Sequence, residues 1–263
     1  MHSLTGWLRA AACFRFPSCP SFISHSASSS TAELDLLVPN LTDTMGLLHV
    51  PRAMMACARG YYRRKAAPSA AATGTCTSDV IGISPQHPHT YDGRVGLFDI
   101  DGYAHMNNAS YFVHAELARW QMSAENGSLD NMLNQRIAFI VTGQAIRYRR
   151  EIGPLFKAFQ INTFVSGIDD RNLWLYHTFH NPGTDGNDGS VQGPALAQIL
   201  VQSVVTQNGK VMKPSKYLAD VYGADDNVIH RLAKMHGDEL LMQKKFKFGE
   251  LESILRESAG RPK

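Results

Sequence analysis

Cysteine is missing from the part of the chain that follows residue 84. All four cysteines of the 263 residues, Cys13, Cys19, Cys57 and Cys76, come before that point. A disulfide framework and a cysteine nucleophile are therefore excluded for the remainder of the chain. The sequence also has no G-x-S-x-G, which disfavours a serine hydrolase.

Long hydrophobic runs and an excess of positive charge are missing as well. The longest apolar runs, such as 45–50 and 137–141, are far shorter than the roughly 20 residues that cross a bilayer, so we predict no membrane span. Seven basic and four acidic side chains precede residue 85, and 19 of each follow it. The net charge of +3 therefore belongs to the N-terminal segment, and we expect no nucleic-acid partner.

The first 84 residues have the composition of a leader. They are rich in Ala, Ser, Arg and Pro and lack sustained apolar periodicity. Residues 1–31 contain Arg9 and Arg15 but no acid, which is typical of a mitochondrial transit peptide, although a disordered tail would have a similar composition. Residues 45–72 are a second half of the leader, a surface helix or, if translation begins at Met45, the true start. We predict a mitochondrial protein, with a cytoplasmic one as the alternative.

Short apolar runs separated by turn residues begin at Pro88. We expect a strand over Tyr91–Phe98, then a helix capped by Asn107 or Asn108 and ended by Gly127. Five apolar side chains recur on one face of that helix: Tyr111, Phe112, Ala115, Ala118 and Met122. Four further strands are expected at Ile137–Arg149, Phe159–Gly167, Leu173–His180 and Leu196–Gln207.

This order of elements predicts an α+β domain over residues 85–222, in which an antiparallel sheet wraps around one central helix. Residues 223–263 look like an amphipathic helical tail, with Val228, Leu232 and Met235 on one stripe. We favour a packing or capping helix for this tail over a membrane-surface helix.

Polar residues concentrate where the first strand leads into the helix, over residues 99–111. Unpaired N–H groups of a first helical turn would lie there beside carboxylates, an imidazole and amides. Such N–H groups stabilise the oxyanion that forms when a thioester is attacked, and a carboxylate supplies the nucleophile or the base that activates water.

This segment resembles a known signature. Residues 99–111 match the D-x-D-x-x-x-H-x-N-N-x-x-Y pattern of the hydroxybenzoyl-CoA and acyl-CoA thioesterases with the hot-dog fold, and 116–119 resemble their E-x-A-R. Residues 146–150, 167–175 and 209–214 are similar to segments of the thioesterase superfamily member six branch. The resemblance implies a hot-dog fold, hydrolysis of an acyl-CoA or related thioester, and a homodimer or a tetramer of dimers. We expect no cofactor, and a metal site formed by Asp99, Asp101 and His105 has no supporting spacing elsewhere in the sequence.

The resemblance also assigns roles to residues. It makes Asp101 the catalytic carboxylate, whereas without it Asp101 is an ordinary turn residue, as we expect Asp99 to be. His105 orients the substrate carbonyl, hydrogen-bonds Asp101 or is purely structural. Ala104 departs from the family, in which glycine often precedes the histidine.

Other residues near the signature have both a structural and a functional interpretation. Asn107 and Asn108 are natural caps; amides near Asn108 are the expected oxyanion hole, and Asn107 with Tyr111 would contact substrate. Glu116 either pairs with Arg119 or is the reserve catalytic carboxylate. Three further arginines meet coenzyme A phosphates or form a solvated face: Arg147, Arg149 and Arg150.

Three functions are consistent with this sequence. Thioester hydrolysis with Asp101 as nucleophile or general base is the leading hypothesis. A catalytically silent hot-dog module that binds acyl groups or a protein partner is the second, and a hydratase or dehydratase is the third.

Overall fold

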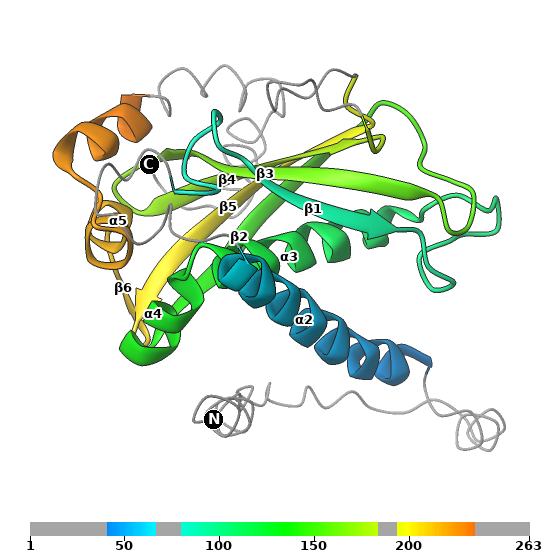
Figure 1. The fold of residues 1–263 in the computed structure, drawn as a ribbon, viewed down its shortest axis with the longest axis horizontal. Helices are drawn as coiled ribbons and strands as arrows, with labels where there is room; N and C mark the ends of the chain where they lie inside the picture. Colours follow the sequence, from blue (N-terminus) through cyan, green and yellow to red (C-terminus); the bar gives the residue numbers. More distant parts are fainter. Residues whose placement is uncertain (1–40, 67–79, 184–193, 235–263) are drawn as a thin grey trace, which may run out of the picture. The chain divides into compact units, whose positions relative to one another are not determined.

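The computed structural model describes residues 41–66, 80–183 and 194–234. Contacts divide the chain into two compact units, residues 1–51 and 52–263. The described residues of the first unit, 41–51, are helical, and the second unit contains the sheet (Figure 1). The transit peptide predicted at 1–31 lies outside the described residues and stays a prediction. No helix of the described ranges has the length and hydropathy needed to span a membrane.

Six strands form one antiparallel sheet in the order β1-β3-β4-β5-β2, with β6 paired to β5. The strands are β1 (His89–Arg94), β2 (Ile137–Tyr148), β3 (Ala158–Ile168), β4 (Asn172–His180), β5 (Ala197–Gln207) and β6 (Lys210–Val211). The four strands expected after the helix have nearly the predicted bounds. The first strand ends at Arg94 rather than Phe98, because its register with β3 stops where Arg94 faces Ala158.

The sheet curls around the helix α3 (Asn108–Glu125), which lies along one face of it (Figure 1). The register of β2 shifts between Val141 and Gly143, and that of β3 between Val165 and Gly167. Bulges of this kind bend a strand and increase its twist. The predicted α+β hot-dog arrangement, a sheet wrapped around a central helix, is confirmed.

The predicted signals at both ends of α3 are confirmed. The side chain of Asn107 accepts a hydrogen bond from the backbone N–H of Ser110, which makes Asn107 the N-cap. Gly127 has a φ of 81°, a conformation that costs glycine little, and it follows the last residues of the helix. Along the helix, Ala115 and Ala118 have no exposed surface, so small side chains let the sheet approach closely.

Three shorter helical segments follow α3 in the described part of the second unit. The helices α4 (Ser128–Gln135) and α5 (Pro214–Tyr222) have predominantly buried apolar contacts at Leu129, Tyr217 and Leu218. The helix α4, which begins directly after Gly127, was not predicted from the sequence. Residues 226–234 are helical, and Val228 and Leu232 belong to the main core, as a packing helix requires. The end of the expected helical tail, from residue 235, lies outside the described residues.

The helix α2 (Leu41–Ala66) continues into the second unit, where it packs on α3. Small side chains make this contact: Ala56 and Cys57 are buried, and a Cβ atom at Gly60 would lie 2.3 Å from the carbonyl oxygen of Gln121. Ile83 is also part of the main core. The predicted domain boundary at residue 85 therefore leaves core residues on the leader side, whereas the compact unit begins at Arg52.

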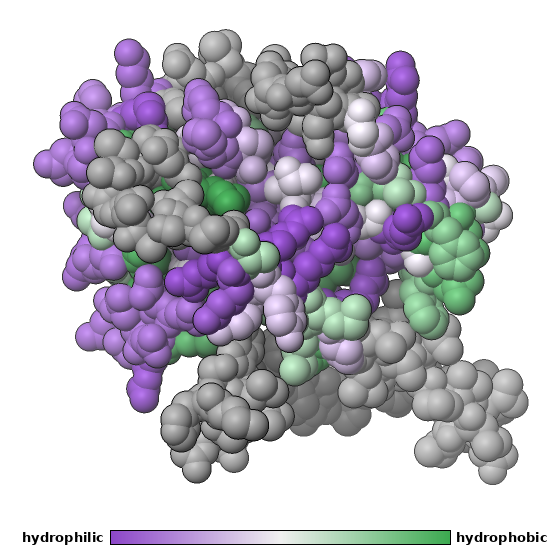
Figure 2. Space-filling view, viewed as in Figure 1, coloured by the Kyte–Doolittle hydropathy of each residue, from purple (hydrophilic) through white to green (hydrophobic). Residues whose placement is uncertain are grey.

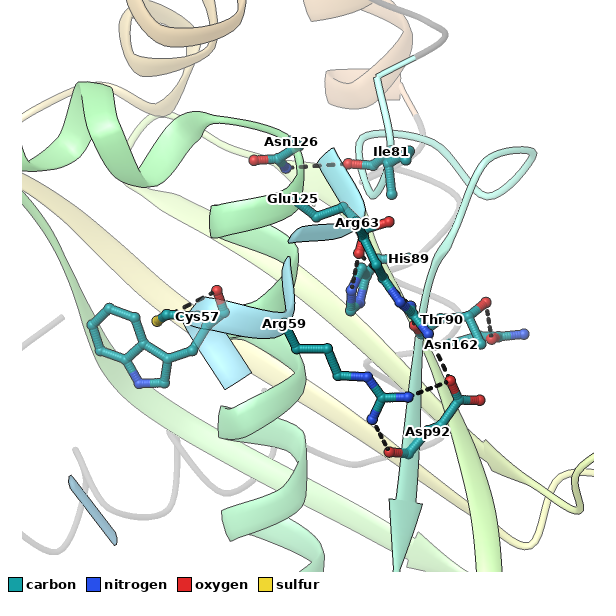
Figure 3. Close-up of polar contacts among 11 residues, drawn as sticks. Cys57, Arg59, Arg63, Ile81, His89, Thr90, Asp92, Glu125, Asn126 and Asn162 are labelled. Carbon is teal, nitrogen blue, oxygen red and sulfur yellow. Dashed lines mark hydrogen bonds and ion pairs between the residues drawn. The ribbon is translucent and has the colours of Figure 1, made fainter. Parts of the chain in front are cut away.

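Arginines of α2 reach the edge strand β1 (Figure 3). Arg63 donates to the carbonyl oxygen of Thr90 at 2.8 Å, and Arg59 donates to that of Asp92 at 3.2 Å. Both guanidinium groups also pair with the carboxylate of Asp92, at 2.7 and 3.1 Å. Because an edge strand has backbone groups without a strand partner, these arginines give its carbonyls the donors that a further strand would otherwise supply.

Candidate active site

The turn between β1 and α3 contains most of the predicted site residues, and Asp99 anchors both its ends. The backbone N–H of Asp99 donates to the carbonyl of Gly96 at 3.0 Å, and its carbonyl accepts from the N–H of Asn107 at 2.7 Å. Ile100 and Met106 face each other in an isolated antiparallel bridge. These bonds close residues 99–107 into a compact loop at the start of α3.

The carboxylate of Asp99 is buried and receives several donors. It accepts from His114 Nε2 at 2.9 Å, from the N–H of Gly96 at 2.9 Å and from the guanidinium of Arg52 at 3.3 Å. Burial alone would raise the pKa of Asp99. The hydrogen bond and charge of His114, the Gly96 N–H and the Arg52 charge together hold this pKa well below its usual range. The sequence predicted only a turn residue at Asp99, whereas in the structure Asp99 also bonds to His114, Gly96 and Arg52.

Asp101, the predicted catalytic residue, lies exposed at the tip of this loop. Its Oδ1 accepts from the backbone N–H groups of Tyr103 at 2.9 Å and His105 at 3.3 Å. Among the described residues, no hydrogen bond to Oδ2 is formed. One carboxylate oxygen is therefore fixed by the loop, while the other is left without a hydrogen bond to the described residues.

Ala104 takes up an unusual backbone conformation in the same loop, with a φ of 61°. A residue with a Cβ atom is strained in this left-handed region by about 1–2 kcal/mol, which glycine avoids. The departure from the family pattern at Ala104 therefore has a conformational cost. The loop accepts it because Ala104 N–H bonds to the carbonyl of Asp101 at 3.1 Å.

His105 contacts Asp101 through its backbone, and its imidazole lies elsewhere. The carbonyl of His105 accepts from the N–H of Asp101 at 2.9 Å. Its Nδ1 lies 3.5 Å from an oxygen of Glu151, and a Cβ atom at Gly153 would lie 2.7 Å from its ring. The predicted bond between the His105 imidazole and the Asp101 carboxylate is therefore not formed, because the ring packs on the segment after β2.

Asn108 and Tyr111 lie at the first turn of α3, next to the end of β2. The hydroxyl of Tyr148 lies 3.5 Å from the carbonyl oxygen of Asn108, and its ring packs edge-on against Tyr111 with centroids 5.1 Å apart. Burial raises the pKa of Tyr111 to about 12. Tyr111 is therefore a neutral and buried side chain, whereas Asn108 is exposed.

Glu116, the reserve carboxylate, lies eight residues farther along α3 than Asn108, about 12 Å away at the helical rise. It accepts from the indole N–H of Trp120 at 3.4 Å. Burial lowers the pKa of Arg119 to about 10, and the charge of Glu116 opposes this shift. The Arg119 guanidinium lies 3.3 Å from His177 Nε2. The structure does not bring Glu116 to the loop of Asp101.

The arginines at the end of β2 are exposed, as a solvated face would be. Arg149 Nε donates to Gln198 at 3.3 Å, and the backbone N–H groups of Arg149 and Arg150 both donate to the carbonyl of Leu196. Within the described ranges, no three or more His, Cys, Asp or Glu side chains are grouped as metal ligands.

Comparison with known proteins identifies the family of this domain. Residues 95–220, from the end of β1 into α5, match the model of the thioesterase-like superfamily. These residues form a thioesterase-like superfamily domain. The match contains the Asp101 loop, α3 and four of the long strands, and it leaves α2 outside.

The thioesterase-like domain also has similar sequences and structures in other organisms. Protein THEM6 of Xenopus laevis is 32% identical over 91 residues, 35% of this chain and 44% of that protein. Protein THEM6 of Drosophila melanogaster is 30% identical over 101 residues, 38% of this chain and 50% of that protein. The chain thus matches half or less of these relatives. The crystal structure of the probable thioesterase YbaW from Escherichia coli is 22% identical, with a TM-score of 0.44, covering 51% of this chain and 98% of the other.

Two residues that contact the signature of the thioesterase-like domain, Arg52 and His114, were not predicted from the sequence. Arg52 lay in the segment interpreted as a leader, and His114 has no distinctive spacing to Asp99. The helical period gave one available signal: His114 lies between Tyr111 and Ala118, on the buried face of α3.

Proposed function

We propose that this protein hydrolyses an acyl-CoA or related thioester, with Asp101 as the nucleophile or general base. The observation that carries the proposal is the placement of the Asp101 carboxylate. One oxygen accepts two backbone N–H groups, and the other has no hydrogen bond to the described residues; the exposed residue belongs to the loop that leads into α3. The membership of the domain in the thioesterase-like superfamily supports the same reaction class.

The first turn of α3 supplies the electrostatic half of the proposed mechanism. Among the described residues, no hydrogen bond uses the N–H groups of Asn108 and Ala109, and both residues are exposed. A thioester carbonyl placed there would receive N–H donors and the positive end of the helix dipole. This environment stabilises the negative charge that develops on the carbonyl oxygen during attack.

Two chemical routes are consistent with Asp101. As a nucleophile, its carboxylate would attack the carbonyl carbon, break the carbon–sulfur bond and release the thiolate, and water would then hydrolyse the mixed anhydride. As a general base, it would take a proton from the water that attacks the carbonyl carbon. The carbon–sulfur bond would then break and release the thiolate, as in the first route. Neither route needs a cofactor.

Apolar side chains around the loop supply a surface for the acyl group. Four large ones are more than half exposed: Leu97, Phe98, Tyr103 and Phe156. The N–H of Phe156 bonds to the carbonyl of Val95, which brings Phe156 beside the segment that contains Leu97 and Phe98. Figure 2 shows apolar side chains gathered on one side of the molecule, where Figure 1 has the loop that follows β1.

A silent binding module is the second candidate function, and the backbone of Ala104 favours it. Left-handed strain at Ala104, within the Asp101 loop, departs from the glycine that the thioesterase pattern often has there, and a protein that does not turn over substrate would tolerate this departure. A module of this kind would keep the apolar surface and the N–H groups of α3. It would bind a thioester without releasing free thiol.

Substitution of Asp101 tests the assignment. Asp101→Asn is nearly isosteric but is neither a nucleophile nor a base, so we expect hydrolysis of a panel of acyl-CoA substrates to be abolished with the thermal midpoint unchanged. Free-thiol release measures the activity, and Glu116→Gln is the matched control, which should retain it. Activity of Asp101→Asn within about tenfold of wild type, only about 1.4 kcal/mol of barrier, would exclude the role and redirect attention to Glu116. An inactive wild type would favour the silent module.

We further propose that the protein is a homodimer, or a tetramer of dimers, which pairs through β2. This strand of 12 residues lies at one edge of the sheet, and Ile140 and Tyr148 are 52% and 42% exposed on it. A long apolar edge strand is a surface that a second copy would cover. The proximity of Tyr148 to Asn108 would then place the site near the subunit boundary.

A further inference from the structure

Asp99 connects the helix α2 to the loop that bears Asp101. Its side chain is 3% exposed, and it accepts donors from three separate segments: His114 on α3, Gly96 after β1, and Arg52 on α2. A buried carboxylate is stable only when several donors surround it, and loss of one cationic donor leaves it undersatisfied. The position of Asp99 therefore depends on Arg52.

The loop in turn depends on Asp99. Backbone bonds from Asp99 to Gly96 and Asn107 join the start of the loop to its end, and Asp101 lies between them. A shift of Asp99 would be transmitted along two residues of backbone to Asp101. It would also move the first residues of α3, because Asn107 is both the bonding partner of Asp99 and the N-cap.

The helix α2 is built to hold Arg52 in place. Arg52, Ala56 and Gly60 are spaced by four residues, which places them on one face of the helix. Ala56 is buried, and Gly60 lies so close to Gln121 of α3 that no side chain fits between them. The spacing of α2 from α3 is therefore fixed by contact, and Arg52 reaches Asp99 as a consequence.

We propose that Arg52 is a positioning residue for the reaction: through Asp99 it holds the loop that presents Asp101 and the first turn of α3. Arg52 lies outside the residues that match the thioesterase-like model, so α2 adds this support to the domain. The proposal rests on the proposed function for its effect on turnover. Its effect on the loop is independent of that function.

The test compares three variants of the full chain. Arg52→Ala removes the guanidinium, Arg52→Lys retains a charge without the fork of N–H donors, and Arg64→Ala removes a charge from the same helix that pairs instead with Asp130. We expect Arg52→Ala to lower kcat by about tenfold or more, which is at least 1.4 kcal/mol of barrier, with KM changed less than about threefold. Arg52→Lys should recover part of the loss, and Arg64→Ala should match wild type.

Hydrogen exchange supplies a measurement that does not depend on activity. The N–H groups of Tyr103 and His105 bond to Asp101, so their exchange should accelerate by about tenfold or more in Arg52→Ala. The N–H of Ile199, in the buried strand β5, should exchange as in wild type. If Arg52→Ala does not fold, Arg52→Gln, a shorter and uncharged side chain that keeps one NH₂ donor, is measured in the same way.

Two outcomes would overturn the proposal. One is unchanged loop exchange together with unchanged kcat in the folded Arg52 variant. The other is an equal loss in Arg64→Ala, which would indicate a general effect of charge on α2. If the wild type hydrolyses no thioester, the proposed function fails, while faster exchange confined to the loop still supports the positioning role.

Discussion

The two edges of the sheet differ in what covers them. At the β1 edge, α2 lies alongside, and Arg59 and Arg63 donate to the carbonyls of Asp92 and Thr90. At the β2 edge, Ile140 and Val141 are 52% and 37% exposed. Both edges face the same physical problem of unpaired backbone groups. At the covered edge α2 supplies the donors within the chain, and at the open edge the proposed second copy would supply them.

This difference explains why one side of the domain needs a segment from outside the thioesterase-like match. The short strand β1 has few residues with which to pair, and α2 supplies both apolar contacts and arginines to it. The long strand β2 bonds to β5 over its whole length, so it is stable as an edge. We therefore expect loss of α2 to affect folding and loss of the β2 partner to affect assembly.

The largest effect is expected from breaking the covered edge at Gly60. In Gly60→Val the added side chain meets the backbone of Gln121 and forces α2 away from α3. Overpacking of this kind costs about 1–3 kcal/mol, and here the loss of the arginine contacts adds to it. Thermal unfolding should show a clear fall of the midpoint, with the exposed Ala58→Val as control. An unchanged midpoint would favour the original interpretation of residues 1–84 as a dispensable leader.

An intermediate effect is expected from adding charge to the open edge. Ile140→Lys places an ammonium at the proposed dimer contact, and two-fold symmetry introduces it twice. We expect sedimentation at micromolar concentration to show a dimer for wild type and a dissociation constant weakened by about tenfold or more for the variant. Val211→Lys, at an exposed position on β6, should leave assembly unchanged. A wild-type monomer would exclude the two-subunit arrangement.

The smallest effect on stability is expected from Asp92, the carboxylate that pairs with Arg59 and Arg63 at the covered edge. Burial opposes ionisation of Asp92, but the hydrogen bond from Gln160 and the charges of Arg63 and Arg59 lower its pKa overall. A depressed pKa stabilises the fold above the unfolded value of about 3.9, and this contribution is lost as pH falls through the folded pKa.

Asp92→Asn should therefore lower the midpoint at pH 6 by the equivalent of about 0.5–1 kcal/mol, modest because the group is partly exposed. The difference in thermal midpoint between Asp92→Asn and wild type should become smaller below about pH 4. Thermal unfolding along a pH series measures this difference. A gap that stays constant down to pH 2.5 would show that the carboxylate charge does not stabilise the edge.

The sequence was a good guide wherever a local rule applied. Asn107 was recognised as a cap, Gly127 as a helix end, and the strands from Ile137 to Gln207 by their apolar runs, since each depends on neighbours in the chain. The signature at Asp101 was recognised for the same reason. Its residues are contiguous, so their types and spacing are visible without the fold.

The sequence by itself determined the α+β order, the hot-dog arrangement and the loop in which Asp101 lies. Tertiary structure alone decided that Asp99 is buried, that the His105 ring turns toward Glu151, and that Arg52 reaches the loop from 47 residues away. The physical reason is that these features are contacts between distant segments. Close approach at Gly60 and burial of a carboxylate depend on what packs against each residue, which a pattern of neighbours in the chain does not contain.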